Sequence, residues 1–553
     1  MKPSTWSPDL AWRVAAALLA AGVLVPIGSL AWLAAGADWA HWRHLAAHVL
    51  PAAAANTAWL LAGVGVIVLV VGTGCAWLVT AYDFPGRRVF NWALLLPLAM
   101  PTYIVAFAYL DLLHPIGPVQ EAIRWVLGYD SPRQFRLPDL RSTTGAVFVL
   151  GFVLYPYVYL TARALFMTQP AHLLEAARTL GAGPLGVFFR VALLETLNDI
   201  GASEFLGVQT LTVTVYTTWI TRSDLAAAAQ IACAMLAMVT ALVLLEQRGR
   251  QRQRFGVAQR MRGIVPARLA GWRAGAASAV VALPIVLGFV APALYLVWET
   301  AKRLSLGYGI SSHLMGALGN TLTLAAGVTA AAMGAALVIA WGARLGATRV
   351  RAPWLLRWPV RVAALGYAVP GTVLAIGLLS PALAFDAWLA DGLGLPGLPL
   401  MSLGIILVVC CAQRFLAIAV GGIEAGLARI PPVLEQAARL LGERPGGVLL
   451  NVHLPLLRPA LGAAALLVFV DAMKELPATL LLRPANFETL ATSLYAEAAR
   501  GTYEEGAVAA LAIVLAGLLP VVLLARTQLK ATQARMAPDV AADARVGARM
   551  KNA

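Results

Sequence analysis

Long apolar runs follow one another along almost the whole chain. Many contain no charged residue over about 20 positions, the length at which a helix crosses a hydrocarbon core of roughly 30 Å. Polar and apolar residues do not alternate, which argues against a membrane β-barrel. The pattern therefore predicts an all-α polytopic membrane protein. The clearest uncharged runs cover residues 14–37, 51–82, 92–110, 143–161, 225–245, 274–298, 314–343, 362–385, 392–413 and 506–525.

The second half of the chain repeats the first. Asn56-Thr57 at the start of one apolar run recurs as Asn320-Thr321, and QPAHLLEAARTLG recurs as IPPVLEQAARLLG at a constant offset of 261 positions. Such self-similarity indicates a tandem duplication. We expect two bundles of about six transmembrane helices each. The predicted domains are a first half at 1–245, a basic hinge at 246–273, a second half at 274–530 and a cytoplasmic tail at 531–553.

Composition and charge agree with a membrane protein. The chain is 60% hydrophobic and 12% charged, too apolar for an ordinary water-soluble protein. Its net charge of +15 could suggest nucleic acid, but the cations lie in short connections between the apolar runs: the hinge carries eight Arg against one Glu, and Arg87 and Arg88 lie in another. The positive-inside rule assigns these connections and the N-terminus to the cytoplasm. This count requires one more span between Arg190 and Leu225.

The repeated block has the pattern of a short polar helix. In each copy a Pro opens the block and a Gly closes it, the usual boundaries of such a helix. Apolar and small residues recur at i, i+3, i+4 and i+7, so one face would allow close approach of another surface. A single copy could lie on the membrane, but two copies on the predicted cytoplasmic side indicate two equivalent sockets for a symmetric partner. The residues concerned are Glu175, Ala176, Ala177 and Gly181 in the first copy, and Glu435, Gln436, Ala437, Ala438 and Gly442 in the second.

These two blocks, EAARTLGAGPLGVFFRVAL and QAARLLGERPGGVLLNVHLP, resemble the EAA loop of binding-protein-dependent ABC transporter permeases of the MetI-like type. In that family the loop is a coupling helix that docks on the ATP-hydrolysing subunit. The resemblance therefore implies a dimer of ATP-binding cassette subunits and a periplasmic binding protein as partners, the bacterial inner membrane as location, and alternating access as mechanism. The second copy departs from the pattern, because Gln436 stands where Glu is usual and Glu435 lies beside it.

The tracts ETLNDIGASEFLGVQTLTVTVYTTW and DAMKELPATLLLRPANFETLATSLY, with the fused two-half layout, are similar to the ferric-iron branch of that family. The resemblance thus implies ferric iron as cargo, in preference to thiamine, polyamine or sulfate. The chain has no GxxxxGK[ST] phosphate loop. We therefore expect that it is not an enzyme and binds no cofactor, and that a separate subunit hydrolyses ATP. Its seven His residues show no metal-ligand spacing.

Several carboxylates follow the two polar blocks at corresponding places. Ionisable residues at membrane depth tend to face a bundle interior or an aqueous path, and an excess of carboxylates suits a hard cation. The alternative is that they lie in outer loops and meet water. The hypothesis is a weak, transient cation path lined by Asp199, Glu204, Asp471 and Glu475, with Glu195 nearby.

Beyond the first block the offset between the halves jumps. Leu193 pairs with Leu454 at 261 positions, but Glu195 pairs with Asp471 at 276, so about 15 residues corresponding to 455–469 are absent from the first half. They would form roughly 22 Å of helix. Either neighbouring helices pull the shortened fifth element across the membrane, or the chain after it inverts. We expect a strained or re-entrant fifth helix in the first half, and reduced or absent transport.

A different class of protein also fits two six-helix halves joined by a basic loop. A secondary transporter driven by an ion gradient has this layout. It has no reason to keep the paired blocks, and it would transport alone in proteoliposomes, whereas a permease needs its ATPase. A third possibility is a membrane scaffold that no longer transports but still binds the ATPase through its second block.

Overall fold

The chain is all-α in the computed structural model, as predicted. The model describes residues 8–36, 39–168, 206–251, 266–307, 309, 312–347, 358–502 and 504–523, and the statements below concern these residues. Within them the only strands are β1 (Tyr82–Asp83) and β2 (Ala267–Arg268), which form one short parallel pair. Nine described helices are long and apolar enough to cross a membrane, or ten if a helix pair bent by 91° counts as one span. The prediction of a polytopic membrane protein is therefore confirmed.

Helices of the first half occupy residues up to 251. They are α1 (Pro8–Gly22), α2 (Val25–Ala35), α3 (Trp39–His44), η1 (Leu45–Val49), α4 (Leu50–Ala81), α5 (Arg87–Ala93), η2 (Leu96–Ala99), α6 (Thr102–Leu112), α7 (Pro118–Leu127), α8 (Thr143–Thr168), α12 (Leu211–Arg222) and α13 (Leu225–Gln251). The last of these continues into the predicted hinge by six residues.

The second half begins at residue 272. Its helices are α14 (Trp272–Ile285), η3 (Val286–Val290), α15 (Ala291–Ser305), α16 (Ser312–Ala347), α18 (Trp358–Ala368), α19 (Gly371–Leu393), α20 (Pro399–Ser402), α21 (Ile405–Leu427), α22 (Pro432–Leu440), α23 (Pro445–Gly447), η4 (Val448–His453), α24 (Leu454–Met473), α25 (Pro477–Leu482), α26 (Leu490–Arg500) and a last helix at Glu504–Leu523.

Three predicted spans are not single helices. Run 92–110 is bent by 91° between η2 and α6, and run 362–385 is interrupted between Ala368 at the end of α18 and Gly371 at the start of α19. The uncharged run 392–413 is not one helix, because α19 ends at Leu393 and the next span, α21, covers Ile405–Leu427. The true span contains Arg414, which the search for uncharged runs excluded. Its guanidinium is buried and paired with Glu475 at 2.8 Å, and a paired charge costs much less inside the protein than an isolated one.

The repeated Asn makes the same contact in both halves. The Nδ2 of Asn56 donates to the carbonyl oxygen of Gln209 at 3.2 Å, and the Nδ2 of Asn320 donates to that of Glu488 at 2.9 Å. Each acceptor lies two residues before a short helix, α12 in the first half and α26 in the second. The duplication therefore extends from the sequence to the three-dimensional contacts.

The Thr beside each Asn fixes the start of the same short helix. The Oγ1 of Thr57 accepts from the backbone N–H of Leu211 at 3.0 Å, and that of Thr321 accepts from Leu490 at 2.8 Å. The two Thr residues are 264 positions apart but the two Leu residues are 279 apart, so the first half is 15 positions shorter between them. The missing tract has therefore not displaced α12 from its expected place.

The chain on either side of residues 169–205, which lie outside the description, reaches opposite ends of α4. Phe166 packs edge-on against Trp77 near the end of α4, with ring centroids 5.5 Å apart, whereas Leu211 bonds to Thr57 near its start. Twenty residues of helix separate the two contacts, roughly 30 Å. The described elements after the missing tract thus keep the orientation of their second-half counterparts, while the shortened fifth element itself lies outside the described residues.

The first span of each half packs against helices of the other half. The α1 helix packs on α16 and α18, and α2 lies between α13 of its own half and α19 of the other, while α15 packs on α6 and η3 on α8. Glycines allow the closest approaches: a Cβ on Gly377 would overlap the carbonyl oxygen of Pro26, and one on Gly288 would overlap that of Phe152. The predicted domain boundaries therefore divide the sequence but do not separate two independent bodies.

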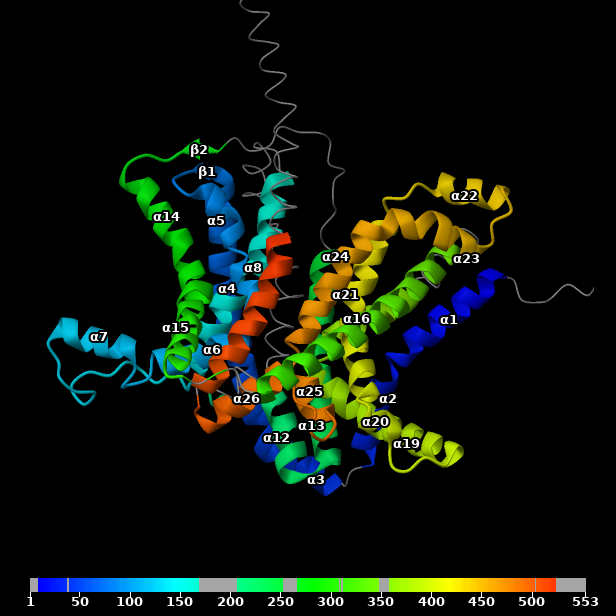
Figure 1. Cartoon of the computed structure of the whole chain (residues 1–553), viewed down its shortest axis with the longest axis horizontal. Helices are drawn as coiled ribbons and strands as arrows, with labels where there is room; N and C mark the ends of the chain where they lie inside the picture. Colours follow the sequence, from blue (N-terminus) through cyan, green and yellow to red (C-terminus); the bar gives the residue numbers. More distant parts are fainter. Residues whose placement is uncertain are drawn as a thin grey trace, which may run out of the picture.

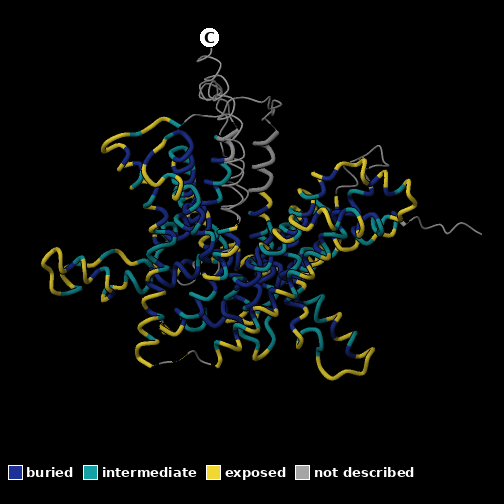
Figure 2. The backbone as a smooth tube through the Cα atoms, turned by 45° about the horizontal axis from the view of Figure 1, so that its top comes forward, coloured by how far each residue is buried: buried dark blue, intermediate teal, exposed yellow. Residues whose placement is uncertain are grey.

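The described parts of the predicted cytoplasmic connections lie at one end of the molecule. Figure 1 shows β1, β2, the start of α14 and α22 at the top, and α12 and α26 at the opposite end. The start of α1 lies near α22, since Asp9 is 3.9 Å from Arg439. In Figure 2 the exposed stretches gather at the ends of the helices and the buried stretches lie in the middle.

Candidate functional site

The second copy of the repeated block forms a helix, as predicted. The α22 helix follows Pro431 at its N-cap, and Gly442 follows it with a φ of +90°, a conformation that favours glycine. It lies at the top end of the molecule, outside the long apolar helices (Figure 1). The first copy, with Glu175, Ala176, Ala177 and Gly181, lies outside the described residues.

One face of α22 is apolar and exposed. Leu440 and Leu441 are 88% and 87% exposed, and Val433 is 67% exposed. Gln436 and Ala437 lie exposed on the same helix, so a partner surface could approach closely there. Val433 and Leu440 lie seven positions apart on α22, and exposed apolar side chains gathered on one helix face are typical of a surface that another protein covers.

Two residues of the predicted docking set face inward instead. Glu435 is 5% exposed, and its carboxylate accepts from Arg344 Nε at 3.2 Å and from Arg439 Nη2 at 2.8 Å. Ala438 is also buried and packs in a small cluster with Trp341 of α16 and Val448 of η4. In this conformation neither side chain is available to a partner, whereas Gln436, Ala437 and Gly442 are.

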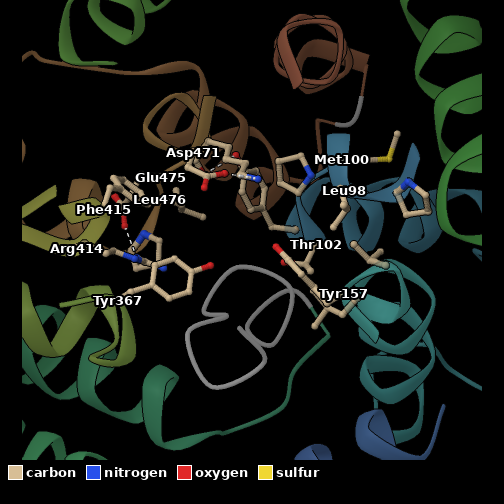
Figure 3. A pocket seen from close by; sticks show the side chains of 17 residues that line it. Leu98, Met100, Thr102, Tyr157, Tyr367, Arg414, Phe415, Asp471, Glu475 and Leu476 are labelled. Atoms are coloured by element: carbon tan, nitrogen blue, oxygen red, sulfur yellow. Dashed lines mark hydrogen bonds and ion pairs between the residues drawn. The ribbon is translucent and has the colours of Figure 1, made fainter. Parts of the chain in front are cut away.

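A second candidate site is a pocket of about 90 Å³ between the halves. The first half contributes residues of η2, α6 and α8 to its lining, and the second half contributes residues of α18, α21 and the α24–α25 break. Figure 3 shows Tyr157 and Thr102 on one side and Tyr367, Arg414 and Asp471 on the other. Of the predicted path residues, Asp471 and Glu475 are therefore brought together here, while Asp199 and Glu204, with Glu195, lie outside the described residues.

Glu475 has a clear structural environment. It is 4% exposed, and one carboxylate oxygen accepts from Arg414 Nη1 at 2.8 Å. The same carboxylate accepts from the backbone N–H groups of Ala478 and Thr479 at 3.1 and 3.0 Å, at the start of α25. It therefore holds the α24–α25 break and α21 together.

Asp471 is more accessible than Glu475. Its side chain is about a quarter exposed, and its Oδ1 lies 2.8 Å from Nζ of Lys474. The described lining thus contains two acidic and two basic side chains, and their formal charges cancel. The excess of carboxylates on which the cation-path hypothesis rested is absent from this part of the lining, and cargo contact by Asp471 stays a prediction.

Sequence reasoning missed the two arginines that organise these sites. Arg344 directly follows the uncharged run 314–343, and Arg414 directly follows the run 392–413, so the search for uncharged spans passes over both. An arginine adjoining a long apolar run is the available signal, since a buried charge requires a partner. Among the described residues, no three His, Cys, Asp or Glu side chains are grouped so as to hold a metal ion.

Comparison with known proteins gives a nearly full-length relative. The chain is 24% identical over 493 residues to the Fe(3+)-transport system permease protein FbpB 2 of Haemophilus influenzae, covering 86% of this chain and 90% of that protein. It is 30% identical over 124 residues to the sulfate transport system permease protein CysT of Synechococcus elongatus, covering 22% of this chain and 41% of that one.

A third relative matches a shorter part of the chain. The putative 2-aminoethylphosphonate transport system permease protein PhnV of Salmonella typhimurium is 30% identical over 172 residues, covering 31% of this chain and 60% of that protein. No protein-family model matches the chain. The relatives are permeases of transport systems, which disfavours the gradient-driven carrier considered from the sequence. The duplicated helical halves and these similarities support a fused two-half permease of the binding-protein-dependent ABC type.

Proposed function

We propose that this permease imports ferric iron across a bacterial inner membrane, with its N-terminus in the cytoplasm. A periplasmic binding protein would deliver the cargo at the end where α12 and α26 lie. A dimer of ATP-binding cassette subunits would dock at the opposite end. The choice of iron rests on the nearly full-length ferric-iron relative, and the choice of side rests on the basic connections.

The exposed apolar face of α22 is the observation that supports docking of the ATPase. A leucine that is almost nine-tenths exposed gains hydrophobic stabilisation when a partner covers it. Gln436 and Ala437 would lie within the same interface, and Gly442 would end it. The ATPase would then move α22. The helices of the permease would adopt one of two packed arrangements, and each partner would favour the arrangement that it binds with the lower free energy.

The pocket between the halves is the proposed transit site for cargo. It lies where residues of both halves meet, so a relative movement of the halves would open or close it. Its balanced charges favour a weak, transient contact, as a permease needs if cargo is to leave again.

The test is transport in proteoliposomes that contain the chain, its ATP-binding cassette subunit and its binding protein. Ferric iron, sulfate and 2-aminoethylphosphonate are supplied in separate assays. ATP-dependent uptake of ferric iron alone would support the proposal. Uptake of another cargo would refute the choice of iron, and uptake without the ATPase would refute the import mechanism. A version carrying a copy of residues 455–469 after Leu193 provides the control for a chain impaired by the missing tract.

A further inference from the structure

The carboxylate of Glu435 in α22 makes its contacts inside the permease. Glu435 lies one position before Gln436, the place where the family pattern has Glu, and the two side chains point in opposite senses: Gln436 is exposed and Glu435 is buried. Its two oxygens are occupied by Arg344 and Arg439, and His453 Nε2 lies 3.9 Å from Oε2. A carboxylate engaged in this way offers nothing to a docking partner.

Arg344 joins three elements through one guanidinium. Its Nε donates to Glu435 of α22 at 3.2 Å, its Nη1 to the carbonyl oxygen of Leu427 at 2.7 Å, and its Nη2 to that of Ile430 at 3.1 Å. Leu427 is the last residue of α21, and Ile430 lies in the connection to α22. The planar fork of arginine suits such a set of acceptors, and a lysine ammonium could not bind all three in the same way.

An apolar layer beneath the ion pair strengthens the same connection. Ala438 packs in a cluster with Trp341 and Leu345 of α16, and Trp341 is fully buried with its ring centroid 4.9 Å from that of His453. On the outer edge, Arg439 approaches Asp9 of α1 at 3.9 Å. Helix α22 is thus fixed to α16 by charge and by packing together.

Helix α16 continues from this contact to the far end of the molecule. Arg344 lies near its last residue, and Thr321, 23 positions earlier, holds the first N–H of α26. At about 1.5 Å per residue the two contacts are roughly 35 Å apart. One continuous helix therefore links the proposed ATPase socket with the opposite face.

We propose that Glu435 and Arg344 form an internal tether that makes α22 and α16 move as one body, so that Glu435 transmits ATPase movement and does not contact the ATPase. This inference rests on the proposed function. It assigns Glu435 as a positioning residue, distinct from the exposed residues that would form the socket.

The test compares docking with coupling in the complex of the full chain and its co-expressed ATP-binding cassette subunit. Two quantities are measured: the amount of ATPase subunit that co-purifies per chain, and the ATP hydrolysis that loaded binding protein stimulates in proteoliposomes. We expect Glu435→Gln to co-purify as much ATPase as the parent chain, and stimulated hydrolysis to fall by about fivefold or more. Glu443→Gln is the matched control, because the same charge is removed from an exposed side chain whose one hydrogen bond among the described residues is to Asn451, at 3.1 Å, and both quantities should stay unchanged.

Arg344→Lys provides a second variant if Glu435→Gln elutes as aggregate in gel filtration. It keeps the positive charge but loses the three-way fork, so we expect retained docking and weakened stimulation. Loss of co-purification in a folded Glu435→Gln chain would make Glu435 a docking residue and overturn the tether. Unchanged stimulation in both variants would overturn it as well. Failure of the parent chain to bind any ATPase would instead refute the proposed function.

Discussion

At the scale of single residues, buried charge pairs fix the positions of helices that hydropathy alone leaves undetermined. Arg414 and Glu475 lie 61 positions apart and meet inside the second half, where both are buried. A window that moves along the sequence detects each as an obstacle to a span and cannot detect that they neutralise each other. Glu435 and Arg344, 91 positions apart, escape sequence reasoning for the same reason.

We predict that Glu475→Gln destabilises the folded chain. The change would leave Arg414 buried without its charged partner, and breaking such a pair costs about 3–5 kcal/mol. Thermal unfolding of the purified chain in detergent should show a clearly lower midpoint. Glu443→Gln, which changes an exposed carboxylate, should leave the midpoint where it is, and an unchanged midpoint in Glu475→Gln would show that the pair contributes little.

Asp471→Asn should behave differently from Glu475→Gln. Its partner Lys474 lies about a quarter exposed, and ion pairs in contact with water contribute about 1 kcal/mol or less. The unfolding midpoint should therefore change little, while uptake of ferric iron falls if Asp471 contacts cargo in the pocket. Normal uptake at every iron concentration would exclude Asp471 from the path.

At the scale of helices, the repeated pattern predicted more than the hydropathy did. The Pro and Gly that bound the second block correctly marked a helix, and the Asn-Thr pair at each long helix correctly marked equivalent structures in the two halves. The faces of α22 could not be assigned in the same way. Ala437 and Ala438 are adjacent and identical, yet one is exposed and one buried, because only the packing of α16 and η4 decides which side is covered.

The packing of each half's first span against the other half was not predicted, because an apolar run does not specify which helix it will contact. It depends on Gly377, where α2 comes so close to α19 that a methyl group would overlap backbone atoms of Pro26. We predict that Gly377→Ala loosens α1 and α2 from the second half and costs about 1–3 kcal/mol through overpacking. Proteolysis of the purified chain between the first spans should become faster.

Gly392→Ala provides the control on the same helix. Nothing lies within 4 Å of the position that its Cβ would take, so the substitution should be neutral or slightly stabilising. Equal protection of both variants from proteolysis would show that the α2–α19 approach is not tightly packed.

At the scale of the whole molecule, the duplication organises both the fold and the proposed mechanism. The Asn and Thr contacts at α12 and α26 give the two halves the same local arrangement, even though the first half is 15 positions shorter. The equivalent contacts agree with the size of that loss, and its place after Leu193 lies outside the described residues. The sequence could not decide between a retained and an inverted orientation, because the outcome depends on contacts such as Thr57 with Leu211, which are 154 positions apart.

We predict that restoring the missing tract increases transport. A copy of residues 455–469 inserted after Leu193 would supply about 22 Å of apolar helix to the first half. Ferric iron uptake should be higher than in the parent chain when both are present in the membrane in equal amounts. Equal uptake by the two chains would show that the shorter element already suffices.

The central claim is that α22 faces the cytoplasm and is covered by an ATPase. The most direct measurement is labelling of Leu440→Cys by a membrane-impermeant maleimide, in a chain whose four native cysteines are replaced by alanine. Leu440 is exposed at the end of α22 in the chain alone. We predict no labelling in intact cells, strong labelling in inside-out vesicles, and protection when the ATP-binding cassette subunit is bound. Labelling of intact cells from outside would contradict it.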